Sequence, residues 1–406
     1  MVRLALRNIK RNRRRSLLSA LAIAVSVLSI LTLLSFVDGM QSDMKENLLT
    51  YYSGEVRLRH SEYSTYERFT PLHLSLDQAK ILDTLSSMPT LNSLSAQITS
   101  PASFIHQGVQ YHAQAIGVGE LTLHPRLDLS SLLLAGRLPE EGEKGVLLGA
   151  LLAQNRGIPV GDELTLIARG ADAVVRSKTV PVIGIVHLPV AELNATAIYL
   201  PLGDLQSLLA MEGRVQEVLL YGDGQAQPVA LAAEVQAHLA KQNIQVESRS
   251  FDQISELYGF FVIVRISYFF IALLFFFLGS TVIINTTMMA IYERMGEIGT
   301  LKALGMDDRA VRKLFVLEGA ILSFFGAVVG LLLGVGVVAI LGTVGIDFTD
   351  ALSGVQMEVS SILYPELRTS SCIFVFLFAL VVAIAATYIA TRRSERVTII
   401  EALHYR

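Results

Sequence analysis

The sequence predicts a polytopic α-helical membrane protein with four transmembrane helices, one followed by three, and a large extracytoplasmic α/β domain between the first and second helices. Composition gives the first indication, because the 406 residues are 52% hydrophobic and only 17% charged, with a mean hydropathy of +0.51. Soluble domains are about a quarter charged. The apolar residues also gather in four runs, each long enough to supply the roughly 20 residues that a helix needs to cross a bilayer. Lys and Arg flank these runs asymmetrically, which predicts their orientation.

The first apolar run, residues 17–37, contains no charged residue, and we interpret it as a retained span. It is longer than the apolar core of a cleaved signal peptide, about 7 to 15 residues, and no A-x-A-like cleavage site follows it. Segment 1–16 carries seven basic and no acidic residues. It is predicted to form a basic helix at the cytoplasmic headgroups, where anionic lipid attracts positive charge.

The other three spans are predicted at 260–292, 319–346 and 369–391. Their flanks differ in basic residues: five lie in segment 293–318, four in the tail 392–406, and one, Arg368, in the connection 347–368. Cytoplasmic loops carry the excess of Lys and Arg. Both termini and segment 293–318 are therefore predicted to be cytoplasmic, and residues 38–255 extracytoplasmic.

The region 38–255 is long enough for a folded domain. Helical periodicity predicts helices at 76–88 and 226–243, and alternation of Val, Ile, Tyr and Phe predicts strands within 96–119. Residues 145–167 read as strand, short helix, turn and strand, and two further strands are expected at 179–186 and 195–202. The single cysteine, Cys372, lies in the fourth run, so this domain has no disulfide.

Two amphipathic stripes extend the first two spans on the outer side. The residues that form them recur one helical turn apart and predict a paired stalk. They are Met40, Met44 and Leu48 after the first span, and Ile254, Leu257, Tyr258 and Phe261 at the start of the second.

The third span carries a regular row of glycines. Gly326, Gly330 and Gly334 lie at i, i+4 and i+8. Such a ridge of small residues lets another helix approach closely in lipid, and we interpret it as a packing surface. The sequence does not say which helix is the partner.

The chain lacks the motifs of the common catalytic and phosphate-binding sites. There is no G-x-x-x-x-G-K-[ST] and no H-E-x-x-H, and the eight histidines are scattered. No catalytic, cofactor or metal site is therefore predicted.

The segment after the second span is the main candidate for function. Its features are charges at helical spacings, two apolar positions, a small residue that allows close approach and a glycine that can end the helix. These are Glu293, Arg294, Glu297 and Lys302, then Ile298 and Leu301, then Gly299 and Gly305. It is either a docking helix for a separate motor or a connecting loop with solvated charges, and periodicity does not separate the two.

The same segment carries a resemblance to a known family. "YERMGEIGTLKALGMDDRAVRKLFVLEGAILSFFGAVVG" resembles the signature region of FtsX-like permeases, the membrane subunits of MacB-type ABC transporters. The matching positions, which end in the Ala-Leu-Gly of residues 303–305, include all eight candidate docking residues. The layout of one span, a large domain and three spans is also similar, so the domain is expected to be like the MacB periplasmic core.

A second stretch, "FVDGMQSDMKENLLTYYSGEVRLRHSEY", resembles the lipoprotein-releasing branch of the LolC/LolE type. In that branch an Asp/Asn-Gly turn, here Asp38–Gly39, precedes a strand-like segment containing Gly54. Ser53 and Glu55 beside this glycine depart from the branch pattern.

The resemblance implies a mechanism and partners. Two permease subunits, the same or homologous, would pair with an ABC ATPase dimer that binds ATP and Mg, so this chain would be non-catalytic and hold no cofactor. Segment 293–318 would be the coupling helix region, and the most favoured activity is extraction or export of lipoproteins from the inner membrane. The alternatives are substrate-free mechanotransmission that regulates an extracytoplasmic partner, and tripartite efflux of drugs or peptides. No nucleic-acid partner is expected.

Overall fold

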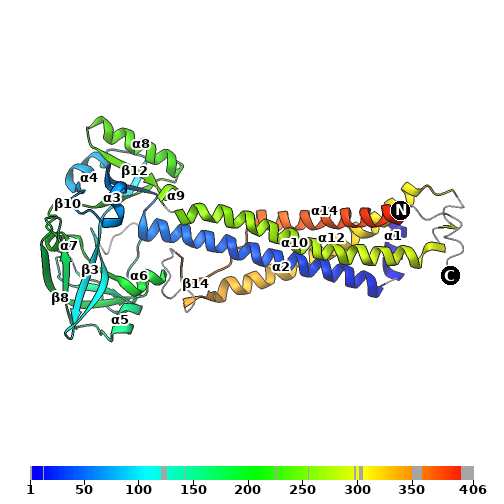
Figure 1. Cartoon of the computed structure of the whole chain (residues 1–406), viewed down its shortest axis with the longest axis horizontal. Helices are drawn as coiled ribbons and strands as arrows, with labels where there is room; N and C mark the ends of the chain where they lie inside the picture. The colour runs from blue at the N-terminus through cyan, green and yellow to red at the C-terminus, as the bar shows by residue number, and fades with distance from the viewer. Residues whose placement is uncertain are drawn as a thin grey trace. The chain divides into compact units, whose positions relative to one another are not determined.

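The computed structural model describes residues 2–11, 13–119, 126–140, 142–224, 226–254, 256–296, 299–300, 305–349 and 359–394 (Figure 1). The chain divides into two compact units. The helical unit consists of Met1–Ser42, Phe260–Ile346 and Leu363–Arg406, and the strand-rich unit of Asp43–Gly259 and Asp347–Ile362.

In the described part of the helical unit, the helices with printed bounds are α1 (Val2–Arg11), α2 (Arg13–Asn47), α10 (Glu256–Glu293), α12 (Asp308–Val344) and α14 (Thr369–Ser394). The last four are long and apolar enough to cross a membrane, which confirms the predicted one-plus-three arrangement. They run alongside one another, and α1, the end of α10, the beginning of α12 and the end of α14 lie at the same end of the bundle (Figure 1).

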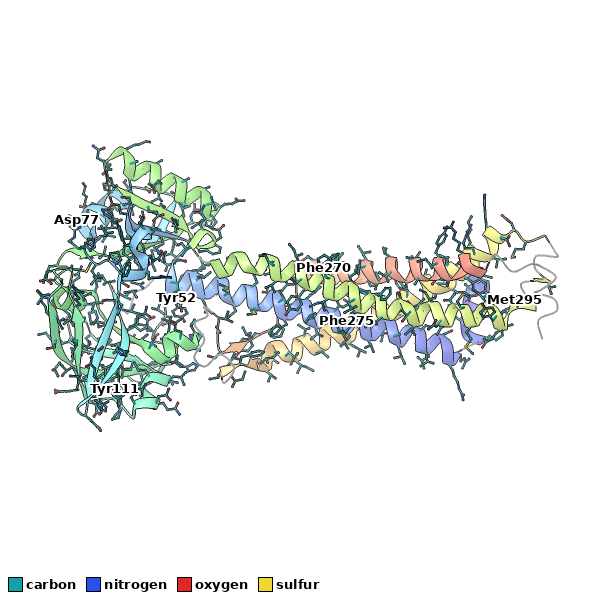
Figure 2. The ribbon with its side chains drawn as sticks, in the orientation of Figure 1. Tyr52, Asp77, Tyr111, Phe270, Phe275 and Met295 are labelled. Atoms are coloured by element: carbon teal, nitrogen blue, oxygen red, sulfur yellow. The ribbon has the colours of Figure 1, made fainter. Side chains whose placement is uncertain are left out.

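The interior of the bundle is formed by all four long helices. Their shared cluster includes Val27 and Ile30 of α2, Phe276 of α10, Ala327 of α12 and Ala379 of α14. Small residues dominate on α12 and α14, which suits close helix approach in lipid. Large apolar side chains cover the outside, as Phe270 and Phe275 of α10 show (Figure 2), with 62% and 40% of their surface exposed. A helix that is apolar on every face is expected in a membrane span.

Among its described residues, the strand-rich unit contains ten strands of one mixed sheet and the separate two-stranded ribbon of β2 and β10. A further short ribbon pairs β13 (Ile346–Asp347) with β14 (Ile362–Leu363). The sheet strands are β1 (Val56–His60), β3 (Leu91–His106), β4 (Val109–Val118), β5 (Leu133–Gly136), β6 (Val146–Gly149), β7 (Glu163–Arg169), β8 (Val175–Val186), β9 (Ala197–Pro201), β11 (Glu217–Gly222) and β12 (Val246–Ser250), and the ribbon strands are β2 (Leu76–Asp77) and β10 (Arg214–Val215). The helical elements are η1 (Leu48–Tyr52), α3 (Tyr63–Tyr66), η2 (Glu67–Phe69), α4 (Gln78–Ser86), α5 (Ala150–Arg156), α6 (Ala191–Thr196), α7 (Leu202–Leu209), α8 (Pro228–Lys241) and α9 (Phe251–Ile254).

Six of the strands close into a ring, because β3 pairs with β4, then β9, β6, β8 and β7 follow in turn, and β7 pairs back with β3. The 16-residue strand β3 joins this barrel to the remaining sheet: its first half pairs with β11 and its second half with β7. Beyond β11 the order is β1 and then β12, with α8 packed against both. The strand-rich unit is therefore a closed barrel with a sheet extension.

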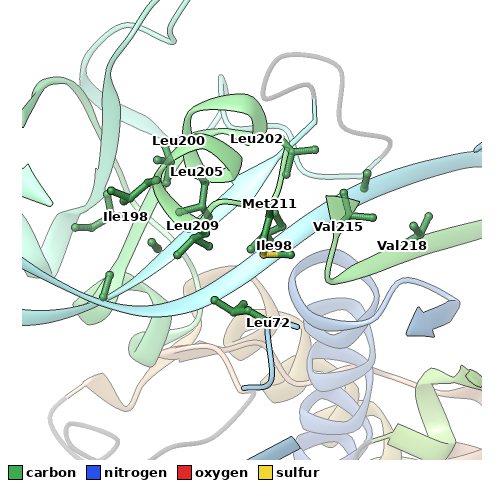
Figure 3. Packing of buried hydrophobic residues seen from close by; sticks show 14 of the residues in the cluster. Leu72, Ile98, Ile198, Leu200, Leu202, Leu205, Leu209, Met211, Val215 and Val218 are labelled. Atoms are coloured by element: carbon green, nitrogen blue, oxygen red, sulfur yellow. The ribbon is translucent and has the colours of Figure 1, made fainter. Parts of the chain in front are cut away.

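Buried Leu, Ile and Val side chains hold this unit together. Ile98 of β3, Ile198 of β9 and Leu205 and Leu209 of α7 lie in one continuous core, all within 1% of complete burial (Figure 3). Because burial of each such side chain contributes roughly 1.5 to 3 kcal/mol, the unit can fold without a disulfide. The only cysteine in the sequence is Cys372, on α14.

Several elements match the predictions closely. The strands expected within 96–119 form the β3–β4 hairpin, whose turn uses Gln107 and Gly108 at positive φ. Residues 145–167 form strand β6, helix α5 and the first part of β7, with Gly157 ending α5 in the left-handed conformation. The helix predicted at 76–88 begins two residues later, where Asp77 caps α4 by accepting from the Lys80 amide at 3.0 Å.

The expected turn at Asp38–Gly39 was wrong, because both residues lie inside the uninterrupted helix α2. A side chain at Gly39 would place its Cβ 2.2 Å from the Tyr364 carbonyl oxygen. The glycine is therefore needed for close packing of the chain before α14 against α2, and it makes no turn. Helix α12 also begins at Asp308, eleven residues before the predicted span at 319.

Candidate functional site

The candidate docking segment begins where α10 ends at Glu293. Glu293 is exposed, Gly299 is buried and Gly305 has a φ of +93°, the left-handed region that favours glycine. The Thr300 hydroxyl donates to the Gly296 carbonyl at 2.9 Å, a helical i to i+4 contact. The candidate residues Glu297, Ile298, Leu301 and Lys302 lie outside the described residues. Docking of an ATPase here stays a prediction.

Arg294 faces the inside of the helical unit, although it was grouped with the docking residues. Only 8% of Arg294 is exposed, and its Nη1 lies 3.2 Å from Oε1 of Glu318, which is equally buried on α12. Its guanidinium stacks over the ring of Phe315 at 5.5 Å. The same Glu318 oxygen accepts a hydrogen bond from Asn8 on α1. Charged groups are rarely buried unless they are paired in this way.

Sequence reasoning missed Glu318. It lies immediately before the uncharged run that begins at Gly319. An ionisable residue beside an apolar run is a signal for a functional or pairing role. The position of Glu318 could be seen in the sequence. The sequence did not show that its partner is Arg294, 24 residues earlier.

Next to this end of α10 lies an open groove of about 600 Å³. It is lined by Asn285, Met288, Met289, Tyr292, Glu293, Met295 and Gly296. Met289 and Tyr292 are exposed by 59% and 46%, and Met295 (Figure 2) is 5% exposed. The groove therefore begins on an apolar helix face and ends at the charged candidate segment.

The stalk residues are partly described. Met44 and Leu48 are completely buried, and Ile254 is half-buried. Nothing is described for the side chains of Leu257, Tyr258 and Phe261, so the pairing of the two stripes stays a prediction. A neighbouring contact joins the same two segments, because the ammonium of Lys45 on α2 lies 5.8 Å from the ring centroid of Phe251 on α9.

The glycine ridge of α12 packs against α2. A Cβ at Gly326 would lie 2.7 Å from the Ala20 carbonyl oxygen, and one at Gly330 would lie 2.5 Å from that of Ala24. At Gly334 the nearest atom is a methyl group of Leu31 at 2.9 Å. Real side chains do not approach this closely, so the backbones of α2 and α12 are in contact through these glycines.

A polar contact joins α2 to α14 at the opposite end of the bundle from α1. Asp38, which is 3% exposed, accepts from the Ser371 hydroxyl at 2.6 Å and lies 3.5 Å from the Arg368 guanidinium. The amide of Glu366 donates to the Ser35 carbonyl at 2.9 Å. We call these contacts, together with Gly39, the α2–α14 clasp. Nothing in the sequence pattern indicated it.

Within the strand-rich unit, the last residues of α2 contact the chain that precedes Ile362. Asp43 accepts from the amide and the hydroxyl of Ser360 at 2.8 and 2.6 Å, and Asn47 donates to the same hydroxyl at 3.1 Å. The Ser361 amide donates to Pro189 at 3.0 Å. The last residues of α2 and the segment 359–362 are therefore held together by hydrogen bonds.

A buried charge cluster lies on β1 and its neighbours. Arg59 lies 2.7 Å from Glu217 on β11, bonds Glu67 on η2, and stacks over Tyr63 at 4.5 Å. Burial lowers the pKa of Arg59, but Glu217 and other anionic neighbours raise it above its usual value. Burial raises the pKa of Glu67, yet Arg59 and Arg57 lower it more, so it lies below its usual value. The cluster is a structural ion network beside an open hollow of about 390 Å³.

Comparison with known proteins defines the class. The MacB-like periplasmic core domain model matches residues 16–241, and the FtsX-like permease C-terminal model matches residues 269–399. The chain is 23% identical over 403 residues to the lipoprotein-releasing system transmembrane protein LolC of Neisseria meningitidis, covering 96% of this chain and 94% of that protein. It is 24% identical over 351 residues to an uncharacterized ABC transporter permease of Methanocaldococcus jannaschii, covering 82% of each. The crystal structure of the periplasmic region of MacB from Actinobacillus actinomycetemcomitans aligns with a TM-score of 0.37 and 16% identity, over 49% of this chain and 89% of that one.

The four candidate spans and the two family-model matches define an ABC transporter permease in which a periplasmic domain separates the first membrane helix from the other three. Within that class, the chain belongs to the family of the MacB-like periplasmic core domain, carries an FtsX-like C-terminal region, and is of the LolC/MacB type. It is a multi-pass inner-membrane protein, and the strand-rich unit is its periplasmic domain.

Proposed function

We propose that this permease converts ATP-driven closure of a separate ATPase dimer into motion of its periplasmic domain, and that the motion extracts lipoproteins from the inner membrane. The observation that carries the proposal is the contact between α12 and α2. Helix α12 follows the candidate coupling segment, and its glycines lie directly on the α2 backbone. Helix α2 runs unbroken from Arg13 to Asn47 and so contributes to both units. A displacement at the start of α12 is therefore transmitted to α2 through backbone contact.

The proposed topology places both termini and segment 293–318 in the cytoplasm. The count of Lys and Arg supports it, and so does the shared end of the bundle at which α1, the end of α10 and the beginning of α12 lie (Figure 1). The ATPase would then meet the charged candidate segment and the neighbouring methionine-lined groove. ATP and Mg would be bound by that ATPase.

Lipoprotein cargo is supported by the full-length similarity to LolC proteins, whose name describes lipoprotein release. The energetics suit an ATP-driven machine, because each acyl CH₂ taken out of the membrane costs about 0.8 kcal/mol. A protein with several acyl chains cannot leave the bilayer at a useful rate by simple equilibrium binding. The second permease subunit would be a copy of this chain or a homologue.

Reconstitution tests the proposal. The permease is placed in proteoliposomes with its ATPase and an acylated reporter protein, and release of the reporter is measured with ATP and with a non-hydrolysable analogue. We expect release only with ATP. The periplasmic domain could instead become protected from protease in an ATP-dependent way without any release of the reporter, and that result would favour mechanotransmission over lipoprotein extraction. ATP-dependent uptake of a small dye would favour efflux.

Docking is tested separately with substitutions in the candidate segment. Glu297→Lys reverses a charge, and Gly299→Leu adds bulk at a buried position. Mismatched charge at an interface costs about 2 to 5 kcal/mol, which is more than tenfold in affinity. Both variants should insert normally but lose the copurifying ATPase, whereas Asp308→Lys, beyond Gly305, should retain it. Wild-type ATPase stoichiometry in both variants would exclude this segment as the docking site.

A further inference from the structure

We propose that Glu318 is a positioning residue that holds the beginning of the coupling segment against the amino-terminal helix α1, so that α1 is part of the coupling device. The inference rests on the proposed function for its role in transport. The geometric part stands independently of an ATPase, because it concerns the described residues of this chain alone.

Two donors from different elements meet at one carboxylate oxygen. Oε1 of Glu318 accepts from Asn8 of α1 and lies 3.2 Å from Nη1 of Arg294, the residue that follows α10. Because both contacts share the same atom, a movement of Arg294 that keeps the ion pair must carry Glu318 with it, and through Glu318 the Asn8 side chain. The positions of α1 and of the coupling segment are therefore linked at a single atom.

The surroundings shield this ion pair from water. Arg294 and Glu318 are each 8% exposed, and Phe315 covers the guanidinium with its ring. Phe315 itself is held in an apolar cluster with Ala290 and Ile291 of α10. Ion pairs in such settings are much less screened by salt than pairs on the surface. The ion pair between Arg294 and Glu318 is thus maintained at physiological ionic strength.

A small polar cavity adjoins the carboxylate. Its volume is about 40 Å³, and Ser19 of α2, Thr286 of α10 and Glu318 contribute polar groups to its wall. Ser19 and Thr286 are hydrogen-bonded to each other at 2.9 Å. Glu318 therefore lies where α1, α2, α10 and α12 meet, which is the place from which one side chain can set the position of the segment between α10 and α12.

The arrangement predicts that Glu318 needs its negative charge, and not only its size, to hold Arg294 and α1 in position. Glu318→Gln keeps the shape and the capacity to accept from Asn8, but it removes the negative charge that lies 3.2 Å from the Arg294 guanidinium. Arg294→Glu combined with Glu318→Arg exchanges the two charges, and the guanidinium then at position 318 can donate to the amide oxygen of Asn8 once that amide is turned over. The exchange should therefore restore much of what either single change removes. Lys313→Gln, an exposed charge change on the same helix, serves as the matched control.

The direct test measures the distance between α1 and the beginning of the coupling segment. In a Cys372→Ala background, spin labels are placed at Arg7→Cys and Gly296→Cys, two exposed sites on α1 and just beyond Arg294. Pulsed electron paramagnetic resonance in nanodiscs, without any ATPase, then gives the distance distribution. We expect a narrow distribution in the parent and in Lys313→Gln, a broad or displaced one in Glu318→Gln, and a narrow one again in the charge exchange. An unchanged narrow distribution in Glu318→Gln overturns the inference.

The functional arm uses the complete transporter. Permease-stimulated ATP hydrolysis should fall at least tenfold in Glu318→Gln, recover at least threefold from that level in the charge exchange, and stay unchanged in Lys313→Gln. If the label distance broadens while hydrolysis stays at the wild-type rate, α1 is positioned by Glu318 but takes no part in coupling, and that half of the inference is wrong. If no ATPase stimulates or binds any form of the permease, the proposed function fails while the positioning result stands.

Discussion

Asp38 of α2 accepts a hydrogen bond from Ser371 of α14 at 2.6 Å, although 333 residues separate them in the chain. Arg368 adds a charge partner at 3.5 Å, and Asp38 is almost completely buried. The first and last membrane helices are thus joined by a polar contact at the end of the bundle opposite α1. A rigid connection there lets α2 and α14 move together when the bundle is displaced from the α1 end.

Loss of the Asp38 carboxylate should loosen α14. In Asp38→Ala the buried Ser371 hydroxyl has lost its acceptor, which costs roughly 1 to 3 kcal/mol. Cys372 follows Ser371 directly and is partly buried, so its reaction with a thiol-specific dye during heating reports the opening. We expect earlier dye labelling in Asp38→Ala and wild-type labelling in Glu366→Gln, whose side chain is exposed. Identical labelling curves for Asp38→Ala and the wild type would contradict a stabilising clasp.

The α2–α12 contact predicts a sharp difference between two glycines of one helix. Gly330→Ala places a methyl group 2.5 Å from the Ala24 carbonyl and must push the helices apart, whereas Gly336 has no atom within 4 Å of its Cβ position. Overpacking of this kind costs typically about 1 to 3 kcal/mol. Gly330→Ala should lower the melting temperature in detergent and reduce ATP-dependent transport, and Gly336→Ala should do neither. Equal behaviour of the two variants would show that close helix approach is not required.

The periplasmic domain should depend on Glu217. This residue is 2% exposed and faces two arginines, Arg59 at 2.7 Å and Arg57 at 4.0 Å. Removing one member of a buried ion pair leaves an uncompensated charge and costs about 3 to 5 kcal/mol. Glu217→Gln should therefore lower the unfolding temperature of the domain, followed by far-ultraviolet circular dichroism of the full chain. Glu62→Gln, an exposed change just before α3, should have no effect. A normal Glu217→Gln melting curve would show that the cluster is not needed for stability.

The stability of the periplasmic domain should depend on pH through Glu67 of the same cluster. Its pKa in the folded protein lies below the unfolded value of about 4.3, because the attraction of Arg59 and Arg57 exceeds the effect of burial. Its stabilising contribution is therefore complete above the unfolded pKa and disappears as the pH falls through the lower, folded pKa. Half of the side chain is exposed, so solvent screening limits the contribution to about 1 kcal/mol or less. The difference in melting temperature between the wild type and Glu67→Gln should be constant at neutral pH and shrink below about pH 4.3; a difference that grows in acid would reverse the assignment.

The sequence was sufficient for the features that depend on local pattern. Uncharged runs predicted the four spans, and alternation predicted the β3–β4 hairpin, because both signals lie within one continuous segment. The barrel closure was not predictable, since β3 pairs with β7 across some sixty residues without any sequence signature. The glycine ridge indicated packing but not its partner. The burial of Arg294 was missed for the same reason, because its counter-charge is on another helix.

The Asp38–Gly39 pair shows why a local signal can mislead. An Asp-Gly dipeptide is a strong turn signal in isolation. Here the long apolar run continues the helix through it, and Gly39 is explained by the backbone of Tyr364 against α2. The tertiary contact, 325 residues away in the chain, decides the role of the glycine.

The extension of α2 beyond the apolar run leads to the last prediction. Met44 is completely buried within the periplasmic domain, one turn before Leu48, which is equally buried. Asp43 and Asn47, on either side of it in the sequence, are bonded to Ser360. An aspartate at position 44 would place a carboxylate at a completely buried position, and burial of an unpaired charge is strongly unfavourable. Because the residue lies beyond the uncharged run, insertion into the membrane should be unaffected.

Met44→Asp should therefore insert at wild-type levels, bind the ATPase normally and lose ATP-dependent release of the acylated reporter. Met44→Leu, which keeps the apolar volume, should retain release, and Glu46→Gln, at an exposed site two residues on, should also retain it. Release is measured in proteoliposomes at equal permease content, with ATP hydrolysis recorded in parallel. Hydrolysis that continues while release stops would place the break between the membrane helices and the periplasmic domain, which is the position of Met44 in the transmission path. Full release by Met44→Asp would show that the outer end of α2 carries no motion, and the path would then have to use one of the other places where the chain passes between the two units.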